Sequence, residues 1–535
     1  MFQRFRQFVT SIFGAKPARE AVPDSGGRLV RAKYDAAQST EEYRNAWANA
    51  DQFDADSAHS KAVRHTLIQR SRYEIGSNGF SDGIAQTYAN DLIGNGPTLR
   101  MQTNSQGFNR MVETTWYFWC KAVKLRRKLW CMAHAKHSDG EAFATLRKNP
   151  GLKHEIKLDL VLHEAEQVQT PYLPFGEQGY IDGIKFDQFG NAIFYDILKQ
   201  HPGTTNAIII NLEPEQISAD CVLHWFKLRR PGQHRAVPEC SSTLNVGVAS
   251  RRLRESTLTA VDTAAEMALW IETNQQPDTA DEVRPFTTWE IVRRMMNFLP
   301  MGWKASQMKS EHPNATYESF MDSLINEQGR PKSMPLNKIK CNSASYNYAS
   351  GRLDHQTYYV QLDVEREDCN DEVLDPLFGA WFDLAVVTFG WLGGNPDAIS
   401  YAARAHIWDW PEHAVADIQT EATANQTKLR SGETFPSELY SKGGRDFEDD
   451  LEKMTRDYFG DVTSENVAEM RKLLRTATFN AQNQQASMDA AAAQQQQADN
   501  AAKAAKLAPP ASAAASLPIN RLLHANGKAN GHAHQ

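Results

Sequence analysis

Residues 244–272, LNVGVASRRLRESTLTAVDTAAEMALWIE, form one long helical pattern. At a rise of about 1.5 Å per residue, such a helix spans ~40 Å. The prolines and aspartate at positions 277, 278 and 285 end the pattern. Its apolar residues repeat at helical spacing and place one stripe along the helix, made of Leu258, Val261, Ala265 and Leu269. A helix of this length with a single apolar stripe needs neighbours that cover the stripe.

The long helix interrupts a region of mixed structure. From about residue 140 to 230 the apolar period shifts towards two, which is typical of strands. Turn signals at 182–183 and 189–191 predict a hairpin between strands at 180–186 and 192–198, and residues 207–210 add another run of strand length. Helical patterns occupy residues 34–93, 108–130, 317–326, 348–402, 411–429 and 447–476. The predicted fold class is therefore α+β with an antiparallel sheet.

The helix predicted at 108–130 combines aromatic and basic residues. They are Trp116, Phe118, Trp119, Trp130, Lys121, Lys124, Arg126 and Arg127. Aromatic rings interleaved with cations can bind single-stranded nucleic acid. An amphipathic helix with a basic, solvated face explains the same pattern, and we prefer this second interpretation.

The composition limits the class of protein. The chain has 535 residues, 41% of them apolar, and a formal net charge of −7, so it has a sizeable core but no broad basic face for nucleic acid. Six cysteines without a C-x-x-C pair predict reduced, mostly packed thiols and no zinc site. No stretch reaches the ~20 apolar residues of a transmembrane helix. Residues 1–14 predict an amphipathic arm that docks on a neighbouring subunit or, alternatively, lies on a membrane surface.

Motifs of known enzyme chemistry are missing from the sequence, which has no Walker ATP site, no nucleophile elbow and no H-E-x-x-H. One constellation resembles the metal site of a nuclease, namely His134, His137, Asp139 and Glu141. In an extended strand the two histidines would point to opposite faces. We therefore predict an exposed, polar strand end there, and surface positions for His163, Glu164 and Glu166.

Five segments between residues 30 and 430 form a recognisable series. They are YDAAQ (34–38) with WANAD (47–51), RSRYE (70–74) with ANDLIGNGP (89–97), IDGI (181–184) with QHPG (200–203), RRPGQHRAVP (229–238), and NYASGR (347–352). In order and spacing they resemble the portal protein family of lambda-type tailed bacteriophages. The sequence departs from the family at Ala349 and Gly351, where a serine-rich run is more common, and residues 290–345 match loosely.

The resemblance implies a portal-type fold with a mixed α/β wing, long stem helices, a small clip, a helical crown and a disordered C-terminal tail. By order along the chain, the segments are an N-terminal arm and linker (1–30), wing (31–240), stem helix (241–276), clip (277–313), second stem helix (314–330), channel loop (331–347), wing helices (348–439), crown (440–476) and low-complexity tail (477–535). It also implies a dodecameric ring. A head-to-tail contact that closes into a ring would cover the stripe of the long helix.

The resemblance further implies a structural protein that is not an enzyme and has no cofactor, no metal and no membrane partner. Its implied partners are further copies of itself, double-stranded DNA in the channel, the terminase large subunit, the major capsid or scaffolding protein, and head-completion proteins. Its implied place is the portal vertex of the virion, after assembly in the host cytoplasm. Lys332, Lys338 and Lys340 are candidates for transient phosphate contacts in the channel, or else ordinary solvated loop lysines. Two alternatives stay open: a metal-dependent nuclease using the four residues above, and another structural protein of the head or tail.

Overall fold

The computed structural model describes residues 45–169, 179–205, 213–266, 316–344, 346–413, 418–442 and 447–476, with short strands at 21–23, 29–31, 270–273 and 303–306. The chain divides into two compact units, Met1–His413 and Ala414–Gln535. Both helices and antiparallel sheets are present, as the sequence predicts. Most of the predicted arm, clip and C-terminal tail lie outside the described residues.

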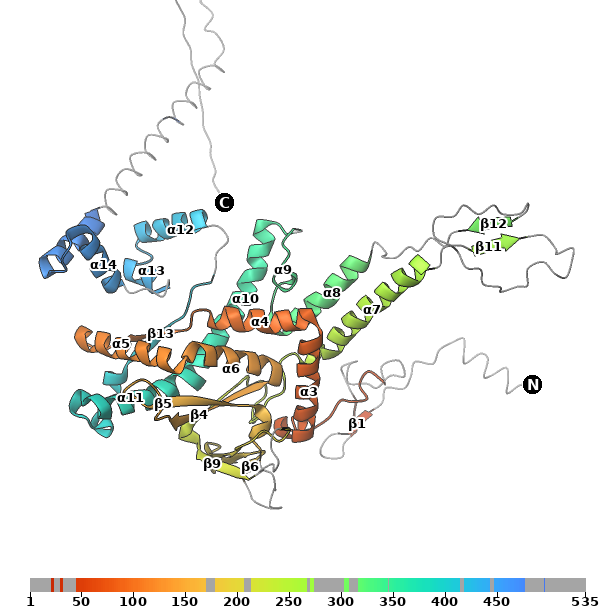
Figure 1. Cartoon of the computed structure of the whole chain (residues 1–535), viewed down its shortest axis with the longest axis horizontal. Helices are drawn as coiled ribbons and strands as arrows, with labels where there is room; N and C mark the ends of the chain where they lie inside the picture. Colours follow the sequence, from red (N-terminus) through yellow and green to blue (C-terminus); the bar gives the residue numbers. More distant parts are fainter. Residues whose placement is uncertain are drawn as a thin grey trace, which may run out of the picture. The chain divides into compact units, whose positions relative to one another are not determined.

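The first unit is built on packed helices around an aromatic core. Helices α3 (Lys61–Ser77), α4 (Gly79–Ile93), α5 (Gln106–Val123) and α6 (Leu125–Asp139) form one layer, and α10 (Tyr348–Cys369) and α11 (Asp375–Phe389) run behind it (Figure 1). The single helix predicted at 108–130 is in fact two, because Lys124 adopts a left-handed conformation with φ of 56° between α5 and α6. Trp116 and Trp119 of α5 are buried and meet Trp381 of α11.

Antiparallel strands cover the other side of α6. Strand β4 (Glu141–Lys148) lies between β5 (Leu158–His163) and β10 (Val222–Phe226). A second sheet has the order β6 (Tyr180–Ile181), β7 (Ile184–Phe186), β8 (Ala192–Leu198) and β9 (Pro214–Ser218). Its β7–β8 pairing confirms the predicted hairpin. A third, two-stranded sheet joins β3 (Thr98–Met101) to β13 (His406–Asp409), far along the chain.

Two helices leave the body of the first unit side by side, α7 (Leu244–Glu266) and α8 (Tyr317–Gly329) (Figure 1). The predicted helix 244–272 ends earlier than expected, at Glu266, and the chain continues into β11 (Trp270–Thr273), which pairs with β12 (Trp303–Ser306). On α7, Leu258 is 59% exposed and Val261 is 37% exposed. Within the described residues, the predicted apolar stripe is therefore left largely uncovered by the chain itself.

The segment after α8 is more ordered than the polar loop predicted from the sequence. It contains a 3-10 turn (Arg330–Lys332) and the short helix α9 (Leu336–Lys340). Ile339 is buried and lies close to the Cα of Gly329, where a side chain would not fit. This apolar anchor folds the start of the segment back onto α8. A π-helical turn (Asn370–Leu374) then links α10 to α11.

The second unit is helical. Its described part contains α12 (Ile418–Ser431), α13 (Pro436–Lys442), α14 (Phe447–Phe459) and a further helical stretch at 464–476. Leu451 and Met470 are buried, and Arg471 forms an ion pair with Glu448. In the described part of the chain, no helix combines the length and apolar character needed to cross a membrane. All six cysteines are free, but Cys131, Cys221 and Cys341 are exposed, so the predicted packing holds for only half of them.

Candidate functional site

The residues of the predicted metal constellation lie where α6 gives way to β4. His134, His137 and Asp139 belong to the last turns of α6, and Glu141 begins β4. The prediction of an exposed strand end is wrong, because His137, Asp139 and Glu141 are all at most 5% exposed. Gly140 makes the sharp change of direction, with φ of 93° and the backbone of Val237 so close that no side chain would fit.

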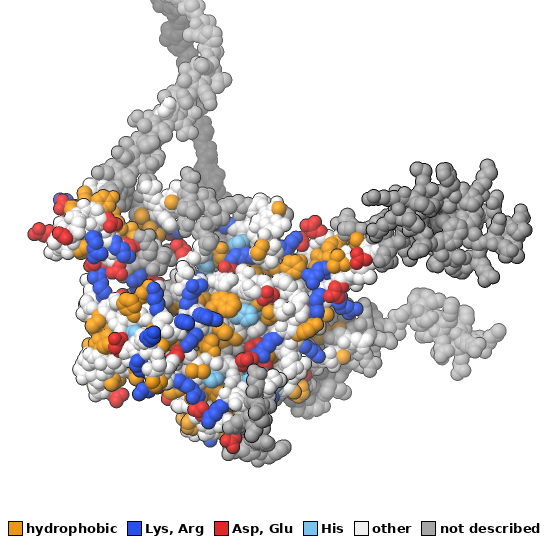
Figure 2. Space-filling view, in the orientation of Figure 1, with side chains coloured by type: hydrophobic (Ala, Val, Ile, Leu, Met, Phe, Trp, Pro, Cys, Tyr) orange, Lys and Arg blue, Asp and Glu red, His pale blue; other side chains and the backbone are white. Residues whose placement is uncertain are grey.

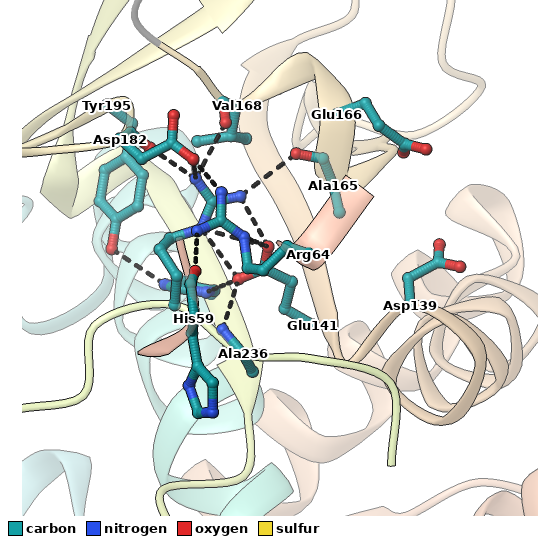
Figure 3. Close-up of polar contacts among 12 residues, drawn as sticks. His59, Arg64, Asp139, Glu141, Ala165, Glu166, Val168, Asp182, Tyr195 and Ala236 are labelled. Atoms are coloured by element: carbon teal, nitrogen blue, oxygen red, sulfur yellow. Dashed lines mark hydrogen bonds and ion pairs between the residues drawn. The ribbon is translucent and has the colours of Figure 1, made fainter. Parts of the chain in front are cut away.

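Glu141 forms a buried ion pair with Arg235 (Figure 3). Its Oε1 lies 2.6 Å from Arg235 Nη2 and its Oε2 lies 2.9 Å from Arg235 Nε, so the pair is bidentate. The Oε2 atom is also 3.3 Å from Nε2 of His224. Burial alone would raise the pKa of Glu141, but Arg235 and His224 outweigh it and hold the pKa well below its ordinary value. Arg235 contacts both carboxylate oxygens, and His224 and the N–H of Ala236 also contact Oε2, so protein donors already occupy the carboxylate.

The same arginine ties three segments of backbone together. Arg235 donates to the carbonyl oxygens of Val168 (2.9 Å), Asp182 (2.5 Å) and Ala165 (3.2 Å) (Figure 3). Its side chain is almost entirely buried. Arg64 of α3 enters the cluster from the other side and pairs with the carboxylate of Asp182. This network therefore fixes the β6–β7 turn and η2 (Ala165–Gln167) against β4.

Asp139 is bound by a second arginine. Arg72 of α3 lies 2.8 Å from its Oδ2 and 2.9 Å from Oε2 of Glu166. Burial works against the charge of Arg72, but Asp139 and Glu166 outweigh it and raise the pKa of the guanidinium. His134 stacks on Trp130, with ring centroids 5.4 Å apart. The structure thus separates the four residues into different polar contacts and does not bring them together around a common point.

One other group of ligand-type residues lies nearby, formed by Glu164, Glu166 and His201. The Nδ1 atom of His201 accepts the N–H of Gly203 at 3.0 Å, which leaves the proton of the neutral ring on Nε2. That nitrogen faces the carboxylates of Glu164 and Glu166 at 3.7 and 3.8 Å. In this tautomer Nε2 offers no lone pair, and both carboxylates are already paired with Arg72, at 3.0 Å for Glu164 and 2.9 Å for Glu166. Glu166 is buried, contrary to its predicted surface position, whereas Glu164 is exposed.

The three candidate lysines occupy different environments. Lys332 is 1% exposed and forms ion pairs with Glu239 and Glu365. Lys338 pairs with Asp91 of α4, and Lys340 lies 2.7 Å from Asp322 of α8. The side chains of Lys338 and Lys340 are 22% and 21% exposed, so both are partly buried; Lys338 has one carboxylate partner, and Lys340 has a second one in Glu318, at 3.9 Å. Lys332 would have to leave its buried partners before it could contact DNA.

Comparison with known proteins identifies the family. The model of the family described as phage portal protein, lambda family, matches residues 41–366, more than half of the chain. The chain belongs to the lambda family of phage portal proteins. The match covers the helical layer, the two larger sheets, α7, α8 and most of α10.

Individual relatives of this portal protein are distant. The probable portal protein of Halomonas phage phiHAP-1 is 20% identical over 426 residues, which cover 73% of this chain and 80% of the relative. A chain in the neck of an empty gene transfer agent particle, computed with C6 symmetry, shares 13% identity with a TM-score of 0.43, over 71% of this chain and 93% of that one. An HK97-family phage portal protein from Corynebacterium diphtheriae shares 12% identity with a TM-score of 0.22, over 55% and 83%.

A buried ionic cluster of the portal protein connects the roots of its two projecting helices. Glu239 lies shortly before α7, and Lys332 follows α8 directly. Their ion pair joins the two ends of the segment that contains α7 and α8. Glu365 of α10 binds both Lys332 and Lys136 of α6, and it accepts a hydrogen bond from Tyr88 at 3.1 Å. Burial would raise the pKa of Glu365, but Lys332 and Lys136 outweigh it and lower the pKa.

Proposed function

We propose that this portal protein assembles into a closed dodecameric ring at one capsid vertex and that double-stranded DNA passes through its channel during packaging and ejection. The family match over residues 41–366 carries the proposal. Head-to-tail contacts that close on themselves give rings, which is the arrangement a channel requires. The exposed apolar residues of α7 support it, because such surfaces mark protein contacts.

We assign regions of the ring by their order in the chain. The wing comprises residues 31–240 and 348–439, and the stem comprises 241–276 and 314–330. The clip (277–313), the channel loop (331–347) and the crown (440–476) complete the subunit. The proposed partners are the terminase large subunit, the head-completion proteins and the major capsid or scaffolding protein. Assembly in the host cytoplasm precedes incorporation into the virion.

The charge of the chain suits a conduit. A formal charge of −7 on 535 residues gives no broad basic surface to hold phosphates. DNA that must slide needs few and exchangeable contacts. We propose Lys338 and Lys340 for these contacts, since both are partly exposed and pair with carboxylates that are themselves accessible to solvent.

Negative-stain electron microscopy and native mass spectrometry of the purified full chain test the proposal. Rings of uniform subunit number with a central hole are the expected result. Replacement of Leu258 on α7 by Asp should reduce the ring fraction, whereas Lys153→Glu at an exposed position of the body should not. A wild-type chain that stays monomeric or dimeric at all concentrations and salt conditions would refute the ring.

A further inference from the structure

Helix α10 carries an exposed stripe that combines apolar and acidic residues. Leu353, Val360 and Val364 are 66%, 64% and 52% exposed. Glu367 of α10 and Asp371 of the π-helical turn after it follow Val364 at spacings of three and four residues, and both are also exposed. We call these five residues the acidic stripe. Large apolar side chains that line up on one face of a helix with this exposure mark a contact surface.

A second exposed surface has the opposite charge. Helix α5 and the start of α6 present the side chains of Met111, Tyr117, Phe118, Lys121, Lys124 and Arg127, which we call the basic face. Figure 2 shows lysine and arginine side chains gathered over this part of the molecule. The Nζ atom of Lys121 lies 4.5 Å from the ring centre of Tyr117. Among the described residues, no carboxylate forms an ion pair with Lys121, Lys124 or Arg127.

The acidic stripe and the basic face point in different directions. The buried side of α5 packs on α11, where Trp116 meets Phe378 with ring centroids 5.7 Å apart. The buried side of α10 packs on α4, where Tyr358 donates to Asp91 at 3.0 Å. Helices α10 and α11 lie behind α5 and α6 (Figure 1). One copy therefore cannot bring its own two surfaces together.

The acidic stripe ends in a concentration of negative charge. Asp368, Asp371 and Glu372 follow one another within five residues, and in the described part of the chain none of them forms an ion pair. Burial first, and then the neighbouring carboxylates Asp368 and Asp371, raise the pKa of Glu372. Cations brought by a docking surface would relieve this repulsion.

We propose that the acidic stripe of one copy docks on the basic face of the next copy. The inference rests on the proposed ring and deepens it by naming the surfaces that meet. The two surfaces belong to the same chain, have opposite charge and each combine charged with large apolar side chains. A contact between two different patches of identical chains is heterologous, and repeated around an axis it closes into a ring.

Charge reversal on each surface tests the docking. The first variant carries Lys121→Glu and Arg127→Glu, and the second carries Glu367→Lys and Asp371→Lys. A control variant carries Lys148→Glu and Lys153→Glu, at exposed positions without an ion pair among the described residues. Native mass spectrometry over a dilution series measures the concentration at which half of the chains are in rings.

Each reversed variant alone should raise that concentration at least about tenfold, because like charges then face one another. The control should match the wild type. Mixing the two reversed variants should restore rings in which the two variants alternate, since every contact then pairs opposite charges. A chain that carries all four reversals should also form rings.

Other outcomes overturn the inference in distinguishable ways. If wild-type rings form and the reversed variants form them equally well, the docking is wrong and the ring stands. If the chain with all four reversals forms rings but the mixture of the two reversed variants does not, the acidic stripe and the basic face do not join different copies. If rings persist and only DNA binding falls in the first variant, the basic face binds nucleic acid. A wild-type chain that never forms rings overturns the proposed function itself.

Discussion

Removal of the Arg235 guanidinium should destabilise the sheet around β4 by an amount that the geometry predicts. Replacement by Met keeps much of the side-chain volume and removes every donor. Glu141 would then remain as a buried carboxylate that has lost its bidentate partner. Three backbone carbonyls, those of Ala165, Val168 and Asp182, would lose a donor as well.

The loss of stability in Arg235→Met depends on the buried groups that lose their partner. Breaking a buried ion pair by removing one partner costs about 3–5 kcal/mol. His224 stays 3.3 Å from Glu141 and Arg64 stays 3.9 Å away, so part of the charge remains compensated. We therefore expect Arg235→Met to cost about 4 kcal/mol, which raises the opening equilibrium of the β4 region about a thousandfold.

Hydrogen exchange of the β4 amides measures this opening directly. Arg147→Met is the matched control, because Arg147 pairs with Glu215 at 3.1 Å while both side chains are about 40% exposed. A half-exposed pair contributes about 0–1 kcal/mol, so the control should change protection little. If Arg235→Met costs less than about 1 kcal/mol, or no more than the control, the buried network does not hold this region together and the reasoning fails.

Three further outcomes follow from the same region and from the lysines. Gly140→Ala should lower the thermal midpoint by much more than Gly190→Ala; both positions have φ near +90°, but only Gly140 lies against another backbone segment. The pKa of Glu141 is depressed, so its stabilising effect should be lost as pH falls below ~4.3, and Glu141→Gln should flatten that slope in acid-unfolding curves. Lys332→Met should destabilise the fold by about 3–5 kcal/mol in urea titrations, whereas Lys340→Met should cost at most about 1 kcal/mol. If Gly140→Ala had no larger effect than Gly190→Ala, or Lys332→Met no larger effect than Lys340→Met, the reasoning from burial would be wrong.

Local patterns in the sequence predicted local structure well. The turn signal at 189–191 predicted the β7–β8 hairpin, and the signal at 182–183 marks the turn between β6 and β7, because hairpin register depends on neighbouring residues. The apolar period located the start of α7 at Leu244 and predicted α8, which runs three residues beyond its expected end. The break between α5 and α6 was missed, because Lys124 adopts a positive φ without being a glycine or asparagine.

The polar interior could not be predicted in the same way. Lys136 and His137 lie on the buried side of α6, where a pattern of polar residues predicts solvent. Their burial depends on partners from distant parts of the chain: Glu365 is 229 residues away from Lys136, and Arg235 is 94 residues away from Glu141. A single sequence contains no local signal for such pairs, so its pattern predicts an exposed strand end where the last turns of α6 lie.

The three candidate lysines show why position in a loop does not define a role. A group that touches moving DNA must exchange its partners quickly, and a surface ammonium in one ion pair loses little when it does so. Lys338 and Lys340 come nearer to this condition than Lys332, because their ion pairs are partly exposed. Lys332 does not meet it, because its departure would remove one cation from two buried carboxylates, Glu239 and Glu365, and leave them to Lys136 and Lys227. The same contacts give Lys332 a different task, since Glu239 precedes α7 and Lys332 follows α8. Its ion pairs hold the roots of these two helices together and so keep the segment that follows α8 in place.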